Sequence, residues 1–371
     1  MSSKGVFPIR KILVFRSGLL GDTLVALPAL HCLKSAFPDA RITYVWQKIP
    51  GKSYVTPVDV LDGSGLIDEF YGYEIAGSAI KALLNYIKLW FFIRRGKFDI
   101  GIVLEAPHWP GRRNRFLRLC GIKTVVGPEG AQNKVYRDGT GRLPAVENIS
   151  DSLVALLAQL NIALPIPGKA KFDILLSSNE EAKARAWLLD RGFEGNGSKR
   201  FVAVAPGSNM QTKRWALDNY YRVLNELISR HGVIPIVLGG PEDSGAADEL
   251  IARWKRGLNA AGRLTIREGI ALLRLCTLFV GNDTGTMHMA VAAGIPCVAV
   301  FSSIDMPGRW EPYGAGHHVM RAEVACAGCL LRECDKGQDQ CINKIGPGEV
   351  YEKCERVLLG GVRYEHSKSH I

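Results

Sequence analysis

The stretch ILVFRSGLLGD, residues 12–22, is an apolar run followed directly by a glycine-containing turn and an acid. Four consecutive large apolar residues suit a strand buried on both faces, and the apolar positions that follow, through about Phe37, have helical spacing. The segment therefore predicts a strand, a loop and a helix in succession. Asp22 stands at the start of that helix, where a carboxylate can cap backbone N–H groups.

The same alternation continues along the chain and restarts after a polar stretch near residues 177–199. Strands that alternate with helices predict parallel, doubly wound α/β sheets, here in two domains, 1–176 and 177–371. Further strands are predicted at 41–46, 98–104, 201–205, 233–238, 278–280 and 297–301, and helices over 78–95 and from about Leu217. Ligands of such sheets bind at the carboxyl ends of strands, which here lead into loops 16–22, 206–214, 239–243 and 281–288.

Composition limits the function classes. The chain has 371 residues, 47% of them hydrophobic, and its 47 Lys and Arg against 36 Asp and Glu give a net charge of +11. This is a globular protein with a preference for an anionic partner. The odd number of cysteines, nine, argues against a disulfide scaffold and favours the reducing cytoplasm. We expect neither a secretory signal nor a transmembrane helix.

Three common phosphate-binding patterns are absent from the sequence. Gly18 and Gly21 form G-x-x-G and not the dinucleotide-binding G-x-G-x-x-G, and Gly51-Lys52-Ser53 lacks the first glycine of a P-loop. No Asp-x-Asp pair exists to hold a divalent metal on a diphosphate. We therefore expect any bound phosphate to be held by cations and backbone amides.

The loop PGSNMQTKRW, residues 206–215, offers such groups. Ser208 and Asn209 are hydrogen-bond donors, and Lys213 is a point charge suited to a phosphate. The alternative is a solvated basic loop in which Trp215 is a packing residue.

A second loop and helix, VGNDTGTMHMAVAAG at 280–294, would present free N–H groups to an anion. Asp283 would repel a phosphate but can accept hydrogen bonds from sugar hydroxyls. His288, one turn into the helix, is either a ligand-binding residue or a core histidine. Glu242, in GGPED at 239–243, either bonds ribose hydroxyls or starts a helix.

Two further segments leave alternatives open. Cys326, Cys329, Cys334 and Cys341 have spacings compatible with a structural zinc site, although free thiols are the simpler reading. The segment HWPGRRNRFLR at 108–118, with the aromatic-rich segment 86–92, suits nucleic acid, an anionic acceptor, a membrane surface, or a plain solvated face.

Taken together and in order, these motifs resemble the bacterial lipopolysaccharide heptosyltransferases, the ADP-heptose-using glycosyltransferase family 9. The resemblance covers roughly residues 11–350. It rests on the opening strand and acidic loop with LPAL at 27–30, KRW at 213–215, GGPE at 239–242, GNDTGxxH at 281–288 and DMPGRWEPYG at 305–314.

The resemblance implies a GT-B architecture of two Rossmann-like lobes and an inverting, metal-independent glycosyl transfer without a required cofactor. The N-terminal lobe would bind the acceptor, with Asp22 as general base. The segments 86–118 depart from the family pattern, and we expect Arg112, Arg113 and Arg115 as acceptor contacts from the charge of that segment. The C-terminal lobe would bind the sugar nucleotide, with Lys213 neutralising the diphosphate. The remaining implied donor contacts are Gly21, Ser208, Asn209, Glu242, Asp283, Thr284, Gly285 and His288.

We therefore expect a cytoplasmic, monomeric glycosyltransferase on the inner face of the membrane. It would move a heptose or related sugar from an ADP-sugar to a lipid-linked saccharide. The alternatives are a sugar-nucleotide epimerase or hydrolase and a non-catalytic nucleotide-sugar-binding protein. Nucleic acid is not an expected partner, because the cations do not gather on one helix.

Overall fold

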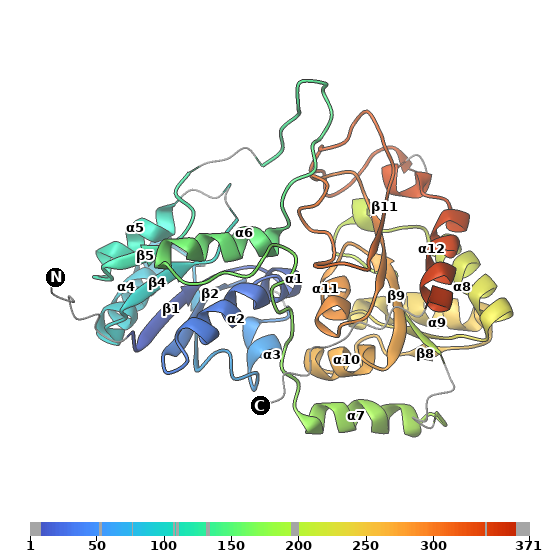
Figure 1. The fold of residues 1–371 in the computed structure, drawn as a ribbon, viewed down its shortest axis with the longest axis horizontal. Coiled ribbons are helices and arrows are strands. Elements are labelled where there is room, and N and C mark those ends of the chain that lie inside the picture. Colours follow the sequence, from blue (N-terminus) through green and yellow to red (C-terminus); the bar gives the residue numbers. More distant parts are fainter. Residues whose placement is uncertain are drawn as a thin grey trace. The chain divides into compact units, whose positions relative to one another are not determined.

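The computed structural model describes residues 9–51, 54–75, 77–106, 108, 111–130, 134–193, 200–337 and 340–360. Lys52 and Ser53 of the rejected P-loop motif, and Trp109 and Pro110 of the 108–118 segment, lie outside them. The chain forms two compact units (Figure 1), Met1–Lys134 with Ile149–Lys171, and Val135–Asn148 with Phe172–Ile371. The second begins at Phe172 rather than 177, and it includes a segment, 135–148, that precedes part of the first unit in sequence.

The first unit is built on a parallel sheet of 5 strands in the order β3-β2-β1-β4-β5. Strand β1 is central, and its residues Ile12 to Phe15 are almost fully buried, as a strand covered on both faces requires. The strands are β1 Lys11–Phe15, β2 Arg41–Lys48, β3 Glu69–Glu74, β4 Ile100–Val103 and β5 Thr124–Val126.

Helices cover both faces of this sheet. Leu13 and Phe15 point to one face and pack with Leu89 and Ile93 of α4 and Leu117 of α5, whereas α2 and α6 contact each other over the opposite face (Figure 1). The helices are α1 Leu20–Leu24, α2 Leu27–Ala36, α3 Pro57–Leu61, α4 Ala79–Gly96, α5 Arg112–Leu119, α6 Ile149–Ala155 and the 3-10 helix η1 Leu156–Leu160.

The first predicted helix is two helices. Helix α1 ends at Leu24, and α2 starts at Leu27 with Pro28 in its first turn. Proline has no N–H to donate to the preceding turn and is accommodated only where the helix begins, so a single helix through Pro28 would be interrupted there.

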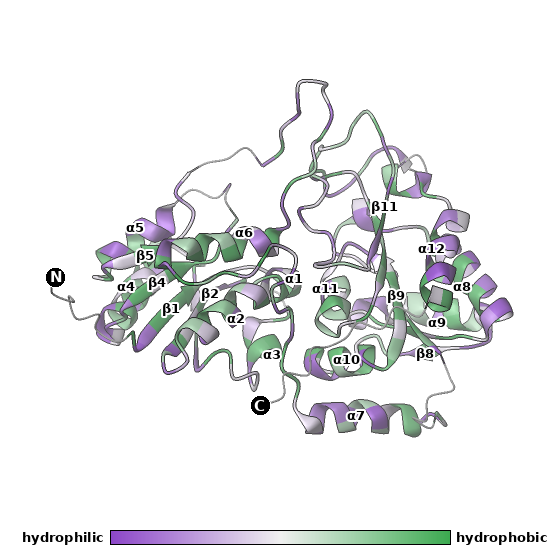
Figure 2. Cartoon of the chain, viewed as in Figure 1, coloured by the Kyte–Doolittle hydropathy of each residue, from purple (hydrophilic) through white to green (hydrophobic). Residues whose placement is uncertain are grey.

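The second unit has a parallel sheet of 6 strands in the order β11-β10-β9-β6-β7-β8. The strands are β6 Phe201–Ala205, β7 Ile234–Val237, β8 Leu258–Asn259, β9 Cys276–Asn282, β10 Cys297–Phe301 and β11 His318–Arg321. Strand β9 is largely hydrophobic (Figure 2), and the central strands are buried. The two parallel, helix-covered sheets confirm the predicted α/β class.

One face of the second sheet packs on α8, α9 and α12 in a single core that includes Trp215 and Tyr220. Helix α10 contacts α7 and α11. The helices are α7 Ser178–Leu189, η2 Gln211–Lys213, α8 Leu217–His231, η3 Pro241–Asp243, α9 Ser244–Trp254, α10 Ile266–Leu273, α11 Gly285–Ala292, η5 Cys341–Lys344 and α12 Pro347–Gly360.

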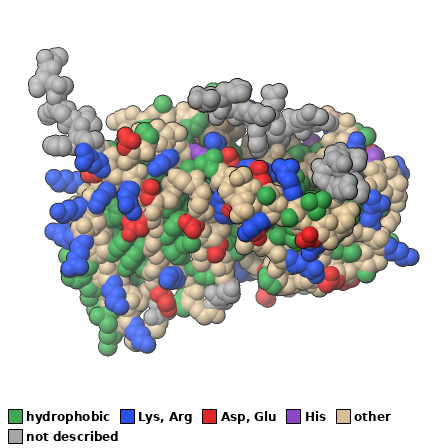
Figure 3. Space-filling model, turned by 90° about the horizontal axis from the view of Figure 1, so that it is seen from below, with side chains coloured by type: hydrophobic (Ala, Val, Ile, Leu, Met, Phe, Trp, Pro, Cys, Tyr) green, Lys and Arg blue, Asp and Glu red, His purple; other side chains and the backbone are tan. Residues whose placement is uncertain are grey.

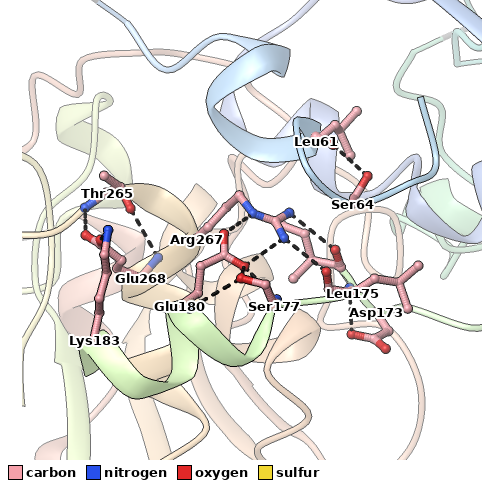
Figure 4. A network of polar contacts seen from close by, with 11 residues as sticks. Leu61, Ser64, Asp173, Leu175, Ser177, Glu180, Lys183, Thr265, Arg267 and Glu268 are labelled. Atoms are coloured by element: carbon pink, nitrogen blue, oxygen red, sulfur yellow. Dashed lines mark hydrogen bonds and ion pairs between the residues drawn. The ribbon is translucent and has the colours of Figure 1, made fainter. Parts of the chain in front are cut away.

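A buried arginine fixes the chain where it enters the second unit (Figure 4). Arg267 of α10 is 7% exposed and donates to the carbonyls of Ile174 and Leu175, the latter at 3.0 Å, and to both carboxylate oxygens of Glu180. Leu175 has φ +54°, an unfavourable conformation for a residue with a side chain, so the bond to its carbonyl offsets backbone strain.

The same contacts determine how Glu180 titrates. Burial opposes ionisation, but hydrogen bonds from Arg267 and from Ser177 outweigh it and lower the pKa of Glu180 to about 2. A depressed carboxyl pKa stabilises the fold above the unfolded value of 4.5 and loses that stabilisation as pH falls toward 2.

We predict that Glu180→Gln lowers the free energy of unfolding by about 2 kcal/mol at pH 7, because Arg267 keeps a buried charge without its counter-charge. The difference from the wild type should shrink between pH 4.5 and 2 in urea unfolding. Glu226→Gln, which breaks an exposed ion pair with Arg230 on α8, is the matched control and should cost under about 0.5 kcal/mol. Equal losses in the two variants would contradict the assignment.

Candidate functional site

The order of strands in each sheet reverses once, and the predicted functional loops lie at those reversals. In the first sheet β1 lies between β2 and β4, and in the second β6 lies between β7 and β9. At such a switch point, successive connections leave in opposite directions and open a crevice at the carboxyl ends of the strands. Loops 16–22, 206–214 and 281–288 follow β1, β6 and β9 respectively.

In the first unit, Asp22 is the third residue of α1. Its Oδ2 accepts the Leu19 N–H at 2.9 Å, and its Oδ1 lies 3.9 Å from the Arg16 guanidinium. Asp22 therefore caps a backbone N–H group at the start of α1. The side chain is still 36% exposed, so the contact orients the carboxylate and leaves it accessible.

Glycine is required at position 18 beside this carboxylate. Gly18 has φ +149°, and a Cβ there would lie 2.3 Å from the Cβ of Asp22. The loop glycine therefore makes room for the Asp22 side chain. Gly21 follows within α1 and contributes backbone alone.

Sequence reasoning missed two residues at this switch point. Arg16, 4% exposed, donates to the carbonyls of Asp22 and Leu104 and so joins the residues that follow β1 and β4. Glu105, 7% exposed, pairs with Arg113. Both Arg16 and Glu105 come directly after a predicted strand, which is the signal that could have found them.

The three arginines expected to bind the acceptor differ in their surroundings. Arg113 is bound to Glu105 and lies over the Phe15 ring at 4.7 Å, and burial lowers its pKa. Arg112 and Arg115, on α5, are exposed. Arg113 thus has a structural partner already, while the other two remain accessible to an anion.

In the second unit, the structure brings Lys213 and Asp283 together. Lys213 Nζ lies 2.6 Å from Asp283 Oδ2, and the two side chains are 19% and 12% exposed. Their loops follow neighbouring strands, β6 and β9, so the ion pair spans the switch point of this sheet. Ser208 is partly buried and its hydroxyl accepts the Met210 N–H at 3.2 Å, whereas Asn209 is exposed.

Asn282 holds these two loops in register. It is fully buried, its Oδ1 accepts from Tyr220 OH at 2.7 Å and from Trp215 N–H, and its Nδ2 donates to the Pro206 carbonyl at 2.7 Å. Trp215 is buried and its indole donates to the Ile345 carbonyl. It is a packing residue, as the alternative reading of that loop had it.

The N-terminus of α11 lies beside this ion pair in sequence. Thr284 is its N-cap but makes no side-chain cap bond, and its buried hydroxyl has no hydrogen-bond partner among the described residues. Gly285 is the first residue of the helix, and His288 is 3% exposed within it. A cation, a hydroxyl and a helix N-terminus can together bind an anion.

Glu242 lies on the loop after β7, next to β6 in the sheet, and it is exposed. Its neighbour Asp243 is more constrained: it accepts the Gly240 N–H at 3.0 Å, burial raises its pKa, and a Cβ at Gly207 would lie 2.1 Å from its carboxylate. Asp243 therefore links the loops after β6 and β7, and Glu242 is left accessible.

The four-cysteine segment packs against the Lys213 loop. Thr212 donates to the Leu331 carbonyl at 2.8 Å, and Gln211 accepts the Cys334 N–H at 3.0 Å. Cys326, Cys329, Cys334 and Cys341 are free thiols. Within the part of the chain that the structure describes, no group of three or more His, Cys, Asp or Glu side chains is arranged to hold a metal, so the zinc hypothesis gains no support.

The model of glycosyltransferase family 9 (heptosyltransferase) matches residues 134–339, more than half of the chain and including all the loops of the second unit just described. The chain belongs to glycosyltransferase family 9. The expected resemblance is confirmed, and this family 9 protein is a glycosyltransferase.

Three relatives of this family 9 protein match over nearly their whole length. A curated lipooligosaccharide heptosyltransferase 2 from Campylobacter jejuni is 24% identical over 357 residues, covering 94% of this chain and 98% of that protein. A glycosyl transferase family 9 structure from Veillonella parvula matches with a TM-score of 0.72 and 20% identity over 95% of this chain and 97% of that chain. The ADP-heptose lipopolysaccharide heptosyltransferase II of Escherichia coli matches with a TM-score of 0.66 and 20% identity, covering 94% and 99%. These likenesses support the GT-B class with two Rossmann-like units.

We predict that Asn282→Ala in this family 9 protein lowers the free energy of unfolding by about 3 kcal/mol, because buried groups of Trp215, Tyr220 and Pro206 lose their partner. Tyr220→Phe removes one of these bonds and should cost about 1 kcal/mol. Urea unfolding measures both. A loss in Asn282→Ala no larger than that in Tyr220→Phe would show that Asn282 does not hold the loops.

Proposed function

We propose that this family 9 protein is an inverting, metal-independent heptosyltransferase of lipopolysaccharide core assembly. The donor is an ADP-sugar, with ADP-heptose as the first candidate, and the acceptor is a lipid-linked saccharide. Family membership and the names of the C. jejuni and E. coli relatives support heptosyl transfer, and the E. coli name supports the ADP-heptose donor. They favour transfer over the epimerase, hydrolase and non-catalytic alternatives.

The observation that carries the donor assignment is the group of Lys213, Thr284 and the α11 N-terminus at the switch point of the second sheet. The diphosphate binds there, with Lys213 Nζ shared between Asp283 and a phosphate oxygen. A fixed cation and helix amides stabilise the charge that develops on the leaving diphosphate. These groups do the work that a divalent metal does elsewhere, so the proposed reaction needs no cofactor.

Other residues of the second unit bind the rest of the donor. Asp283, whose second oxygen stays available, accepts hydrogen bonds from sugar hydroxyls. Exposed Glu242 binds the ribose hydroxyls, and Ser208 and Asn209 donate to the phosphates. His288, which is buried within α11, lines the donor pocket with Thr284 and Gly285.

Asp22 of the first unit is the base. The acceptor hydroxyl oxygen attacks the anomeric carbon, its proton passes to the Asp22 carboxylate, and the bond to the β-phosphate oxygen breaks with its electron pair leaving on ADP. A single displacement of this kind inverts the anomeric centre. Exposed Arg112 and Arg115 bind anionic groups of the acceptor.

The acceptor also sets the location of the enzyme. A lipid-linked saccharide places a cytoplasmic, monomeric transferase at the inner face of the membrane as a peripheral protein. No helix among the described residues is long and apolar enough to span a bilayer.

We predict that Asp22→Asn lowers turnover by roughly 10²- to 10⁴-fold while changing ADP affinity by no more than a few-fold. Asparagine still accepts the Leu19 N–H and preserves the cap, so the loss comes from the missing base. Transfer from ADP-heptose to a lipopolysaccharide acceptor measures turnover. Asp59→Asn is the matched control, because Asp59 occupies the same third position and accepts the Thr56 N–H in α3. An equal loss of turnover in the control would leave Asp22 with a structural role alone.

Lys213→Ala should weaken ADP binding by roughly tenfold to a hundredfold, because a charge-assisted contact to the diphosphate is lost. Isothermal calorimetry measures this. Lys255→Ala removes an exposed cation just after α9, outside the predicted loops, and should leave ADP affinity unchanged. Unaltered affinity in Lys213→Ala would remove this residue from the donor site.

A further inference from the structure

Helix α4 is apolar on two opposite faces. One face packs on the sheet through Leu89 and Ile93. The other is exposed and carries five large apolar side chains at the spacing i, i+3, i+4, i+7, i+11, which places them in one stripe. These are Ile80 at 71%, Leu83 at 60%, Leu84 at 51%, Ile87 at 41% and Phe91 at 49% exposed. Packing on the first sheet accounts for the buried face of α4. The exposed stripe does not pack on that sheet.

The neighbouring helix extends this surface. The indole of Trp90 donates to the Leu119 carbonyl at 3.3 Å, and the rings of Tyr86 and Phe116 are 6.0 Å apart, so α5 lies against α4. Leu119 at the end of α5 is 74% exposed. We refer to the stripe of five residues on α4 together with Leu119 as the α4 surface.

The charged side chains of helices α4 and α5 are all basic. Helices α4 and α5 contain no Asp or Glu, and each has four basic residues. Figure 3 shows apolar side chains interspersed with Lys and Arg on the side of the first unit where Figure 1 places α4. The basic residues are Lys81, Lys88, Arg94 and Arg95 on α4 and Arg112, Arg113, Arg115 and Arg118 on α5.

A pocket of about 720 Å³ adjoins the C-terminal half of α4. Four cations and one carboxylate line it: Lys88 and Arg95 of α4, Lys11 and Arg41 at the starts of β1 and β2, and Glu69 at the start of β3. Phe91 belongs both to this pocket and to the α4 surface. The pocket therefore offers positive charge beside an apolar stripe, a combination that matches a phosphate group attached to acyl chains.

We propose that the α4 surface docks on an anionic phospholipid bilayer, with α4 lying in the interface and a lipid phosphate in the adjoining pocket. An amphipathic helix with basic flanks binds such surfaces through apolar burial and attraction to anionic lipids. This docking proposal rests on the proposed function, because an enzyme with a lipid-linked acceptor has to reach a membrane surface.

Charge argues against a second copy of the chain as the occupant. In a symmetric dimer the α4 surface would contact the α4 surface of the second copy. The basic residues of α4 and α5 would then face the same basic residues, and neither helix has a carboxylate to neutralise them. Anionic lipid headgroups neutralise the same residues.

The docking surface has a consequence for the acceptor. The pocket lies at the amino ends of β1 and β2, and Asp22 follows the carboxyl end of β1. Strand β1 has 5 residues and so spans roughly 16 Å. The accepting hydroxyl therefore stands at least that far from the lipid phosphates, which suits an acceptor with sugars between the lipid and the reacting position.

Vesicle flotation of the full chain tests the proposal. It should bind vesicles of phosphatidylethanolamine and phosphatidylglycerol and bind pure phosphatidylcholine at least tenfold more weakly. Leu84→Glu should lower affinity for the anionic vesicles by tenfold or more, and the double variant Lys88→Gln, Arg95→Gln should do likewise. Leu189→Glu, at an exposed leucine of similar accessibility on α7, should bind as the wild type does. Inorganic phosphate at 10 mM should not displace the vesicles, which separates a lipid headgroup from free phosphate.

Absence of binding to anionic vesicles, or equal binding by Leu84→Glu and wild type, would overturn the proposal. So would sedimentation showing that the wild type is a dimer that Leu84→Glu dissociates. Transfer to a water-soluble saccharide acceptor should be unchanged in Leu84→Glu. A wild type that does not bind anionic vesicles but still performs this transfer contradicts the docking surface alone, whereas absence of transfer in the wild type contradicts the proposed function alone.

Discussion

The fold of each unit depends on one constraint, the reversal of strand order within a sheet whose strands are all parallel. Parallel pairing places the carboxyl ends of β1 and β4, and of β6 and β9, at the same edge, and the reversal sends their helices to opposite faces. Polar groups from two loops can then meet beside the gap that remains. The Lys213–Asp283 pair and the Arg16 contacts with Asp22 and Leu104 are the results of this geometry in the two units.

The central strands were predictable because burial on both faces leaves continuous apolar runs. Strands at 201–205 and 297–301 match their predictions residue for residue. The outer strands β3, β5, β8 and β11 were missed. Strands β5 and β8 have only 3 and 2 residues, β11 is half exposed, and β3, with the sequence EFYGYE, carries a glycine and two acids. What distinguishes such a segment from a loop is its partner strand, and a partner is not visible in local sequence.

The candidate site was predictable as a set of loops but not as a set of contacts. Lys213 and Asp283 were each singled out, yet their pairing follows from the register of β6 with β9, which spacing does not encode. Arg113 was expected to contact an acceptor, and spacing does not reveal that it also pairs with Glu105, which follows β4. Asn282 illustrates the same limit, since its importance comes from three partners far apart in sequence.

The segment 135–148 has a consequence for biosynthesis. The chain passes between the units three times, at residues 134–135, 148–149 and 171–172. The residues that this segment contacts are translated much later. Val146 donates to the Pro307 carbonyl, Asn148 donates to the Glu311 carbonyl, and a Cβ at Gly308 would overlap the Val146 carbonyl. Asn148 and Gly308 are separated by 160 residues, so at roughly 5 to 20 residues per second the segment leaves the ribosome roughly 8 to 32 s before its binding loop. During that interval the finished sheet of the first unit carries a length of chain whose native partner has not yet been translated.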